Sequence, residues 1–547
     1  MRKFNVTGLC VPDLHYMVDI GEKIEQIFHL VEEKAYFTIN RGRQYGKTTT
    51  IGMLETRLVG EPCRTMPNEY LCASISFLYS TDKMFADEAG FCQGLLDSIY
   101  ESFEYNNPEE AQKWVDKSVT DFKLLSRLIT RICRNSEKKV VLIIDEADEA
   151  SNNNLFVRFL KMLRDKFLFR NAGKDFTFHS VILAGVYDIR NLKLKMIHAG
   201  NYTPSAGESA VNSPWNIAVD FDVDMSFSAR EIETMLVEYE NDHHTGMDIG
   251  AIAQEIRYYT SGYPYLVSRI CLLIEQDLNR NWTLDGVQQA IKLILKEEST
   301  LFDDLIKKLE ENAELSDLMF DLTVGKMRYA FNVDDPVMKL GLMFGFLARD
   351  TDGLQIHNKI FEIRITNYFV TKRTRNWRTN EIAQNAANEI IRDNVFDMEL
   401  CLTKFKRNYA EIYNDDNLKF LEREGKLIFL IYLKPLINGL GFYHFESETR
   451  DYGKIDMVVD FLQQQFILEM KLWYGDSRHE EAYRQLADYL TSKNMDCGYL
   501  LTFDFRREVD NRFYENKWID YDGKRIFDVV LQVERRTRAR TRKKSSQ

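Results

Sequence analysis

The sequence holds a glycine-containing turn followed by a lysine and three threonines, an arrangement suited to binding phosphate groups. The turn lies between an apolar run at 35–40 and a helical pattern at 51–60. Phosphate oxygens are bound by backbone N–H groups, by the N-terminus of a helix and by a lysine. We therefore expect Lys47 to reach the β- and γ-phosphates of a nucleotide, and Thr48 to hold Mg²⁺.

An acidic pair supports this interpretation, because the turn alone departs from the usual spacing. Three residues separate Gly42 from Gly46 where four are usual, and Arg41 stands at the expected first glycine. About a hundred residues later, an apolar strand ends in Asp145 and Glu146. We expect Asp145 to bind Mg²⁺ through water and Glu146 to act as the catalytic residue that polarises the attacking water. The alternative is a solvated acidic loop. The nucleotide-binding candidates are Gly42, Arg43, Gln44, Tyr45, Gly46, Lys47, Thr48, Thr49 and Asp145.

A second group of charged residues lies near the C-terminus, on two predicted strands. Asp456 begins one strand pattern, and Glu469 and Lys471 stand near the end of the next, QQFILEMKLW. Residues two apart in a strand share a face, so Glu469 and Lys471 point the same way. Carboxylates that bind Mg²⁺ stabilise in-line attack on a phosphodiester, and a lysine can orient the water. Burying these charges is costly unless they are paired or metal-bound. The alternative is an exposed strand face with an ordinary ion pair.

The order of strands and helices predicts α/β units at both ends of the chain. In the N-terminal half, apolar strands alternate with helices as in a parallel sheet, with strands expected at 35–40, 71–79, 138–150 and 176–188. After about residue 224 the pattern turns helical, and an Asp-Gly turn within 344–358 predicts a small hairpin, typical of a winged-helix module. From Phe420 onward, a helix, three strands and a helix between the last two predict a second α/β unit.

The N-terminal motifs resemble those of AAA-like, archaeal-type P-loop ATPases related to the STAND class. In that group the loop is often altered in the way that NRGRQYGKT is here, and the stretch SGYP at 261–264 looks like its Gly-x-Pro element at the start of a lid helix. The resemblance covers about residues 10–370 and implies ATP and Mg²⁺ as cofactors. Asp188, Arg190 and Asn191 follow the fourth strand, where a γ-phosphate sensor could lie, and a structural capping role is an equal alternative.

The C-terminal unit resembles the PD-(D/E)xK nuclease superfamily over about residues 418–510. Asp456 matches the first strand acid, Glu469 the second acid and Lys471 the lysine. Glu424, in the preceding helix, matches a glutamate that some members use, and Gln485 matches a glutamine that follows the lysine strand. The resemblance implies metal binding by Glu424, Asp456 and Glu469, and catalysis by Asp456, Glu469, Lys471 and Gln485. Met470 occupies a variable position between acid and lysine.

Together these patterns predict an α/β protein: a P-loop parallel sheet with a helical lid and winged helix, plus a restriction-endonuclease-like α/β domain. We expect a P-loop AAA-like ATPase domain at 1–222, a helical lid at 223–310, a winged-helix module at 311–370, a helical connector at 371–417, a nuclease-like domain at 418–533 and a basic tail at 534–547.

The composition of the chain bears on its location in the cell and on its partners. It has 547 residues, 45% of them hydrophobic, and no apolar run reaches the roughly 18–20 residues of a membrane helix. Its N-terminus lacks the apolar core of a secretory signal, and its eight cysteines form no CxxC pair, so we expect a cytoplasmic protein with reduced thiols and no membrane partner. Net charge is −12, yet the tail is strongly basic, as in segments that touch phosphate backbones or as in a solvated tail.

Three functions are consistent with these observations. The first is an ATP-regulated nuclease acting on nucleic acid, DNA rather than RNA, in defence against foreign DNA by analogy with the resembling families. The second is a STAND-like switch or DNA-binding regulator whose C-terminal domain grips nucleic acid without cutting it. The third is an ATPase whose C-terminal domain contacts a protein. The sequence leaves open whether the chain forms a homo-oligomer.

Overall fold

The structure, a computed structural model, divides into two compact units. It describes residues 2–60, 69–79, 83–150, 153–185, 215–325, 327–351, 353–374, 386–412, 422–437, 440–444, 457–506 and 511–533. One unit comprises Met1–Ala290 with Lys339–Leu347, and the other comprises Ile291–Met338 with Ala348–Gln547.

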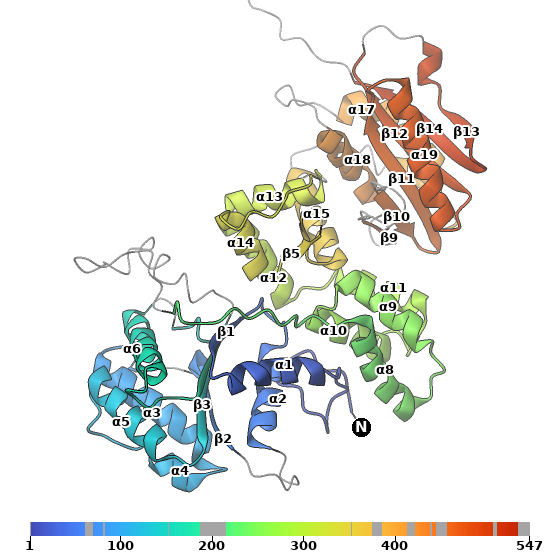
Figure 1. The fold of residues 1–547 in the computed structure, drawn as a ribbon. Coiled ribbons are helices and arrows are strands. Elements are labelled where there is room, and N and C mark those ends of the chain that lie inside the picture. Colours follow the sequence, from blue (N-terminus) through green and yellow to red (C-terminus); the bar gives the residue numbers. More distant parts are fainter. Residues whose placement is uncertain are drawn as a thin grey trace, which may run out of the picture. The chain divides into compact units, whose positions relative to one another are not determined.

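A four-stranded parallel sheet forms the centre of the first unit (Figure 1). Its strands are β1 (Tyr36–Asn40), β2 (Tyr70–Ser76), β3 (Lys139–Asp145) and β4 (Ser180–Gly185), and their order is β1-β4-β3-β2. Three of these strands lie within the predicted runs and β2 begins one residue before its run, so the four strand predictions are confirmed. Beyond β1, Phe37 forms a further parallel bridge with Val219. Strand β4 thus separates β1, which leads into the glycine turn, from β3, which ends in Asp145.

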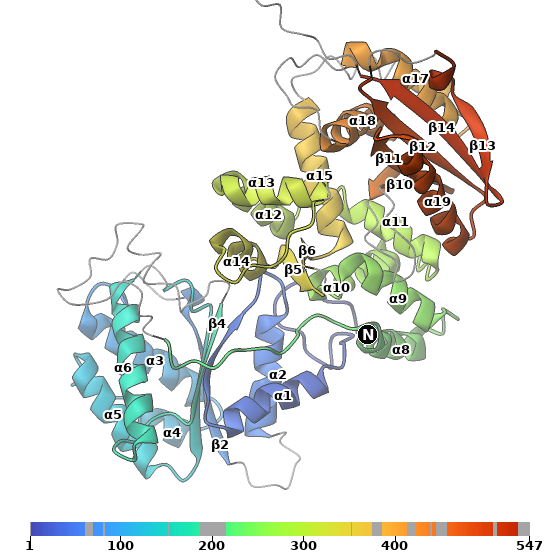
Figure 2. The same cartoon turned by 45° about the horizontal axis from the view of Figure 1, so that its top comes forward.

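Helices cover both faces of this sheet, which explains why its strands are apolar almost throughout (Figures 1 and 2). Helices α3 (Glu88–Glu104), α4 (Pro108–Gln112), α5 (Phe122–Asn135) and α6 (Asn154–Asn171) lie on one side, and α1 (Gly21–Glu32) and α2 (Lys47–Val59) on the other. Residues of α3, α5 and α6 form one buried cluster with alternate residues of the strands, including Leu142 and Ile144.

Four helices follow the sheet: α8 (Ala229–His243), α9 (Ile249–Thr260), α10 (Pro264–Gln276) and α11 (Leu284–Ile294). Ser228 caps α8 through a reciprocal pair of hydrogen bonds with Glu231, the arrangement typical of a serine followed three residues later by a glutamate. Between α9 and α10 the backbone is left-handed at Ser261 and Gly262. A Cβ atom at Gly262 would lie 1.9 Å from the carbonyl oxygen of Phe227, so this turn requires glycine.

The second unit begins with helices α12 (Thr300–Glu311) and α13 (Ala313–Thr323), while α14 (Pro336–Met343) crosses the boundary between the units. The two-stranded sheet of β5 (Leu347–Asp350) and β6 (Gly353–Ile356) confirms the predicted hairpin, and α15 (Lys359–Thr374) follows it. The assignment of these elements to a winged-helix module, like the six-part division of the chain, stays a prediction.

The C-terminal part of the second unit is a six-stranded sheet of order β13-β14-β12-β11-β10-β9. Its strands are β9 (Gly441–His444), β10 (Met457–Phe461), β11 (Gln464–Leu472), β12 (Cys497–Asp504), β13 (Lys517–Tyr521) and β14 (Lys524–Gln532). Strands β11, β12 and β14 are parallel, whereas β9, β10 and β13 pair antiparallel to their neighbours.

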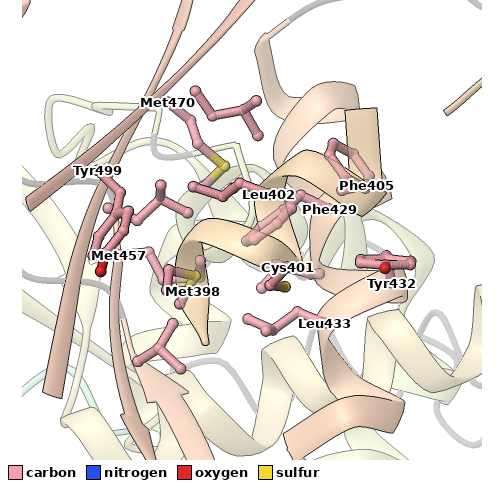
Figure 3. Close-up of a cluster of buried hydrophobic side chains, with 14 of the residues drawn as sticks. Met398, Cys401, Leu402, Phe405, Phe429, Tyr432, Leu433, Met457, Met470 and Tyr499 are labelled. Carbon is pink, nitrogen blue, oxygen red and sulfur yellow. The ribbon is translucent and has the colours of Figure 1, made fainter. Parts of the chain in front are cut away.

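Helices on opposite faces of this sheet bury two separate clusters. Helices α17 (Met398–Ile412) and α18 (Glu422–Ile437) pack on the face that carries Met457, Met470 and Tyr499 (Figure 3). Helix α19 (Asp476–Ser492) packs on the other face, against Ile467 and Leu500. Since residues alternate along β11, Glu469 and Lys471 belong to the α19 face.

The segment predicted as a helical connector contributes to this C-terminal core. Within its described residues lie the short strands β7 (Ile391–Arg392) and β8 (Val395–Phe396), which pair with each other, and helix α17. Cys401, Leu402 and Phe405 of α17 are fully buried among the residues of α18 and the sheet (Figure 3). The segment is therefore more than a linker, because its helix completes one apolar layer.

Candidate functional site

The glycine turn has the backbone geometry that joins a strand directly to a helix N-terminus. Gly46, with φ of 77°, is the residue before α2, and Gln44 also has a positive φ of 56°. A Cβ atom on Gly42 would stand 2.4 Å from the carbonyl oxygen of Phe344, so side chains are excluded there by a close backbone contact within the same unit. The turn leaves the first N–H groups of α2 facing the loop, as an anion site requires.

Lys47 lies at the start of α2 with its side chain folded under the loop. Its ammonium group donates hydrogen bonds to the carbonyl oxygens of Arg41 and Gly42, each over 3.0 Å. Burial lowers the pKa of Lys47, and the carboxylates of Glu146, Asp148 and Asp145 oppose that shift. A buried cation held by loop carbonyls beside three acids is placed to exchange those neutral partners for phosphate oxygens.

Thr48 and Asp145 meet from different elements of the sheet. The Thr48 hydroxyl donates a hydrogen bond of 2.9 Å to Oδ2 of Asp145, which is buried at the end of β3. Oδ1 of Asp145 accepts a 2.9 Å hydrogen bond from the backbone N–H of Glu146. A hydroxyl and a carboxylate that converge in this way are hard oxygen ligands, which fit Mg²⁺.

Glu146 occupies the first position beyond β3 in a left-handed conformation, with φ of 50°. Such a φ is uncommon for a residue with a side chain and stores strain. The next residue holds the turn in place, because the N–H of Ala147 donates to the carbonyl of Ala184 in β4 over 2.9 Å. Burial raises the pKa of Glu146, Asp145 adds to the rise and Lys47 opposes it.

Three further residues support the loop, and sequence reasoning did not find their contacts. The ring of Tyr45 is buried and meets that of Tyr263 edge-on at 4.7 Å, and the Tyr263 hydroxyl donates to the carbonyl of Arg43. The Thr49 hydroxyl accepts a 3.2 Å hydrogen bond from the N–H of Cys10. Tyr45 and Thr49 therefore shape the loop, and their predicted contact with a nucleotide stays a prediction. Asp188, Arg190 and Asn191 lie outside the described residues.

The C-terminal candidate site centres on Glu469 and Lys471 of β11. Glu469 is fully buried, and the Lys471 ammonium, on a side chain 32% exposed, lies 2.5 Å from its Oε1 in an ion pair. Asp456 lies outside the described residues; β10 begins at the next residue, Met457, whose antiparallel partner is Leu468, the neighbour of Glu469. Glu424 belongs to the first turn of α18, but its side chain lies outside the described part.

A pocket of about 270 Å³ lies between the end of β11 and α19, and Lys471 lines it, whereas the fully buried Glu469 is not among its lining residues. Lys471 lines it together with the predicted Gln485 and with His479, Arg478 and Trp473. The structure thus brings Lys471 and Gln485 to one pocket, although they are 14 positions apart on different elements. The predicted catalytic roles of both residues stay predictions.

A buried polar network beside this pocket was missed by sequence reasoning. The Tyr483 hydroxyl donates to Oδ2 of Asp528 over 2.9 Å and lies 2.8 Å from Nε2 of His479, which is itself 3.4 Å from the same carboxylate oxygen. Thr502 approaches Nδ1 of His479 at 3.5 Å. Two signals were present: His479 and Tyr483 are four apart in a predicted helix, and Asp528 interrupts the apolar run FDVVL.

The described residues hold no group of three or more His, Cys, Asp or Glu side chains arranged to bind a metal ion. Of the predicted ligands Glu424, Asp456 and Glu469, the structure describes the side chain of Glu469 alone. The predicted metal site at this end of the chain therefore stays a prediction. No helix within the described ranges is long and apolar enough to cross a membrane.

The chain was compared with known proteins at three levels. No protein-family model matches it, and no curated protein matches it. Similar solved structures include the Walker-type ATPase of Pyrococcus abyssi, at 10% identity over 66% of this chain and 99% of that chain, with a TM-score of 0.44. They also include the ORC2 protein of Aeropyrum pernix, at 13% identity over 68% and 98%, with a TM-score of 0.39. A third is Drosophila ORC bound to DNA, at 10% identity over 64% and 87%, with a TM-score of 0.32.

Since all three TM-scores lie below 0.5, the class of the protein rests on its own fold and site. The first unit is an α/β fold whose parallel sheet has β4 between β1 and β3, and the glycine turn into α2 and the Thr48–Asp145 contact are consistent with a P-loop ATPase.

Proposed function

We propose that the chain binds and hydrolyses ATP with Mg²⁺ in its first unit and cleaves phosphodiester bonds of DNA with a metal-dependent site in its second. The observation that carries the ATPase half of this proposal is the hydrogen bond of 2.9 Å between Thr48 and Asp145 at the N-terminus of α2. The DNA substrate, and a role in defence against foreign DNA, are proposed from the family resemblances.

In the first unit, each residue has a distinct task. The N–H groups at the start of α2 and the Lys47 ammonium bind the phosphates. Thr48 and Asp145 would hold Mg²⁺, which when bound neutralises charge that develops on the phosphate oxygens. Glu146 accepts a proton from the attacking water, a task suited to a carboxylate whose pKa is raised toward neutrality.

In the second unit, the argument rests on the cost of burying Glu469. A carboxylate with no exposed surface in an apolar strand is retained when it binds something that outweighs its desolvation. Glu469 and the predicted acids Asp456 and Glu424 would hold the metal, which when bound stabilises the charge of the phosphodiester under attack. Lys471 is partly exposed and lines the pocket together with Gln485, so both can reach a substrate phosphate.

Two variants test the two halves of this proposal separately. We expect Lys47→Ala to abolish ATP hydrolysis, and Lys471→Ala to abolish cleavage of DNA in Mg²⁺ or Mn²⁺ while ATP hydrolysis continues. Cleavage is measured on single- and double-stranded DNA and RNA, with and without ATP. If no substrate is cut by the parent chain while ATP is hydrolysed, the nuclease half of the proposal is wrong. Equal cutting by Lys47→Ala and the parent would show that ATP does not regulate cleavage.

A second candidate, an ATP-driven switch with a C-terminal domain that does not cut, is favoured by one observation. Lys471 lies 2.5 Å from Glu469, so the two charges can compensate each other without a metal. The cleavage assay decides between the candidates, because binding without cutting is the outcome that only the switch predicts.

A further inference from the structure

The second unit contains a basic pocket that the proposed activities do not use. It has a volume of about 410 Å³ and is lined by residues of α11, α12, α15, α18 and β9 and of the turns next to them. All lining residues belong to one compact unit, and α15 packs against both α18 and β9 (Figures 1 and 2). The volume falls within the range of pockets that bind small molecules.

Every charged residue among the described lining of this pocket is basic: Lys292, Lys296, Arg364 and Lys434. The chain as a whole carries a net charge of −12, so a pocket whose charged lining residues are all basic is unlike the rest of the chain. Cations gathered in a concave surface raise the local concentration of anions. The lining therefore selects a negatively charged ligand.

The four cations lie on three helices, and in the turn after one of them, that pack around the pocket. Along α15, Arg364 and Asn367 are three residues apart and Thr371 follows four later, which places them on one side of the helix. Lys292 lies in the last turn of α11, Lys296 lies two residues beyond the end of that helix, and Lys434 lies in the last turn of α18. Rigid elements hold these groups in position, as a binding site requires.

Lys434 is the most informative of the four. Its ammonium group donates to the carbonyl oxygen of Asn367 over 3.1 Å and to the Thr371 hydroxyl. Burial lowers its pKa to about 8, and the nearby Arg364 adds to that shift. Burial lowers the pKa of Arg364 as well, and the carboxylates of Asp303 and Glu297 oppose that shift. An anion in the pocket would repay the desolvation of both cations.

Aromatic rings complete the lining and narrow the class of anion. Tyr368, Phe442 and Tyr443 face the pocket alongside the cations. The ammonium of Lys292 stands 5.6 Å from the centre of the Phe442 ring, and the Tyr443 hydroxyl donates to the side-chain oxygen of Asn367 over 3.1 Å. Cations bind phosphate, and aromatic rings stack on bases, so the combination suits a ligand that has both.

We propose that this pocket binds a nucleotide through its phosphate and its base, at a site separate from the P-loop. The nucleotide is either free in solution or part of a single strand, since both present the same phosphate and base.

The experiment measures how fast Lys434 is acetylated in the full chain at pH 8 without divalent metal, by mass spectrometry of its peptide. The probes are AMP, sodium phosphate, adenosine and a short single-stranded oligothymidylate. At ten times its dissociation constant, AMP should slow labelling of Lys434 about tenfold by mass action. Lys307, an exposed lysine of α12 outside the lining, is the control in the same chain and should be unaffected. The readout is local, so nucleotide at the P-loop does not register.

The outcomes separate the sources of ligand and the ways in which the proposal fails. Protection by AMP at lower concentration than by phosphate or adenosine supports a free nucleotide, and protection by the oligonucleotide at still lower concentration supports a strand. No protection by any probe at millimolar concentration overturns the proposal, and so does equal protection by phosphate and AMP. Equal protection of Lys307 and Lys434 overturns it too.

Binding to variants provides the second measurement. In the Lys47→Ala chain, Lys434→Gln should weaken AMP binding in equilibrium dialysis by about tenfold or more, as expected for loss of a charge-assisted hydrogen bond. Lys307→Gln makes the same charge change outside the pocket and should leave binding unchanged. Unchanged binding in Lys434→Gln, with the variant folded, would overturn the site assignment.

Discussion

Thr48 at the start of α2 donates its hydroxyl hydrogen to Asp145 at the end of β3, over 2.9 Å and across 97 positions of sequence. These two residues join the turn that follows β1 to a strand that is not its neighbour in the sheet, because β4 lies between β1 and β3. The contact therefore depends on the pairing of both strands with β4.

Replacing Asp145 by Asn should separate nucleotide binding from metal binding. The amide is similar in size but carries no charge, so it holds Mg²⁺ weakly. We expect ATP hydrolysis to fall by about 100-fold or more, as for loss of one group that stabilises a transition state. ATP binding measured in EDTA should be retained. Thr48→Ser keeps the hydroxyl and is the control; hydrolysis by Asp145→Asn at the parental rate would contradict the metal role.

Glu146→Gln should bind ATP and hydrolyse it about 10²–10⁴-fold more slowly, the range for loss of a general base. In the parent, the acidic limb of the rate profile should lie above pH 4.5, because burial raises the pKa of Glu146 and the carboxylate is needed unprotonated. The folding stability of this variant gives an independent test of the raised pKa. A raised carboxyl pKa costs folded stability as pH rises through it, so the glutamine variant should be more stable near neutral pH. A less stable variant would contradict the burial argument.

Gly42→Ala should damage the phosphate loop through a backbone collision. The new Cβ atom would lie 2.4 Å from the carbonyl oxygen of Phe344, and neither backbone can move freely. We expect a loss of about 1–3 kcal/mol in unfolding free energy, the usual cost of overpacking, together with weaker ATP binding. Gly52→Ala is the matched control inside α2, where the nearest atom is the flexible Cδ1 of Leu9 at 3.0 Å. Equal effects of the two substitutions in thermal unfolding would show that the Phe344 contact is unimportant.

Glu469→Gln tests whether the buried carboxylate binds a metal ion or only forms an ion pair with Lys471. If it binds metal, the variant should lose DNA cleavage and lose the rise in melting temperature that Mn²⁺ gives the parent. It should not be destabilised without metal, because it removes a buried charge and leaves the partly exposed Lys471 able to reach water. Marked destabilisation without metal, with the Mn²⁺ effect retained, would favour a structural ion pair.

Lys434→Met should stabilise the chain at neutral pH, and the gain should shrink as pH rises. Burial lowers the folded pKa of Lys434 to about 8 from an ordinary value of 10.5. The folded state thus binds fewer protons than the unfolded state between these values, so the parent gains stability as pH rises through that window. We expect the unfolding free energy of the variant to exceed that of the parent by about 1 kcal/mol at pH 7. One unit of pKa shift corresponds to about 1.4 kcal/mol, and solvent screens much of the effect. Chemical denaturation at several pH values measures it, with Lys307→Met as the control.

The sequence predicted local features well where they depend on neighbours along the chain. The four strands of the first sheet, the serine cap of α8 and the hairpin of β5 and β6 all lie where periodicity and turn residues indicate. The face shared by Glu469 and Lys471 also follows from strand alternation. The helix α17 was predicted as a connector, because one apolar stripe does not reveal which surface it will cover.

The sequence by itself determined where the chain turns from strand to helix at Gly46, which residues carry charge, and which side chains alternate along each strand. These follow from backbone sterics and short-range periodicity. The tertiary structure decided that Thr48 meets Asp145, that Phe344 closes on Gly42, that His479 and Tyr483 meet Asp528, and that basic residues of three helices share one pocket. Such contacts join positions far apart in the chain, and they depend on how whole elements pack, which no local pattern records.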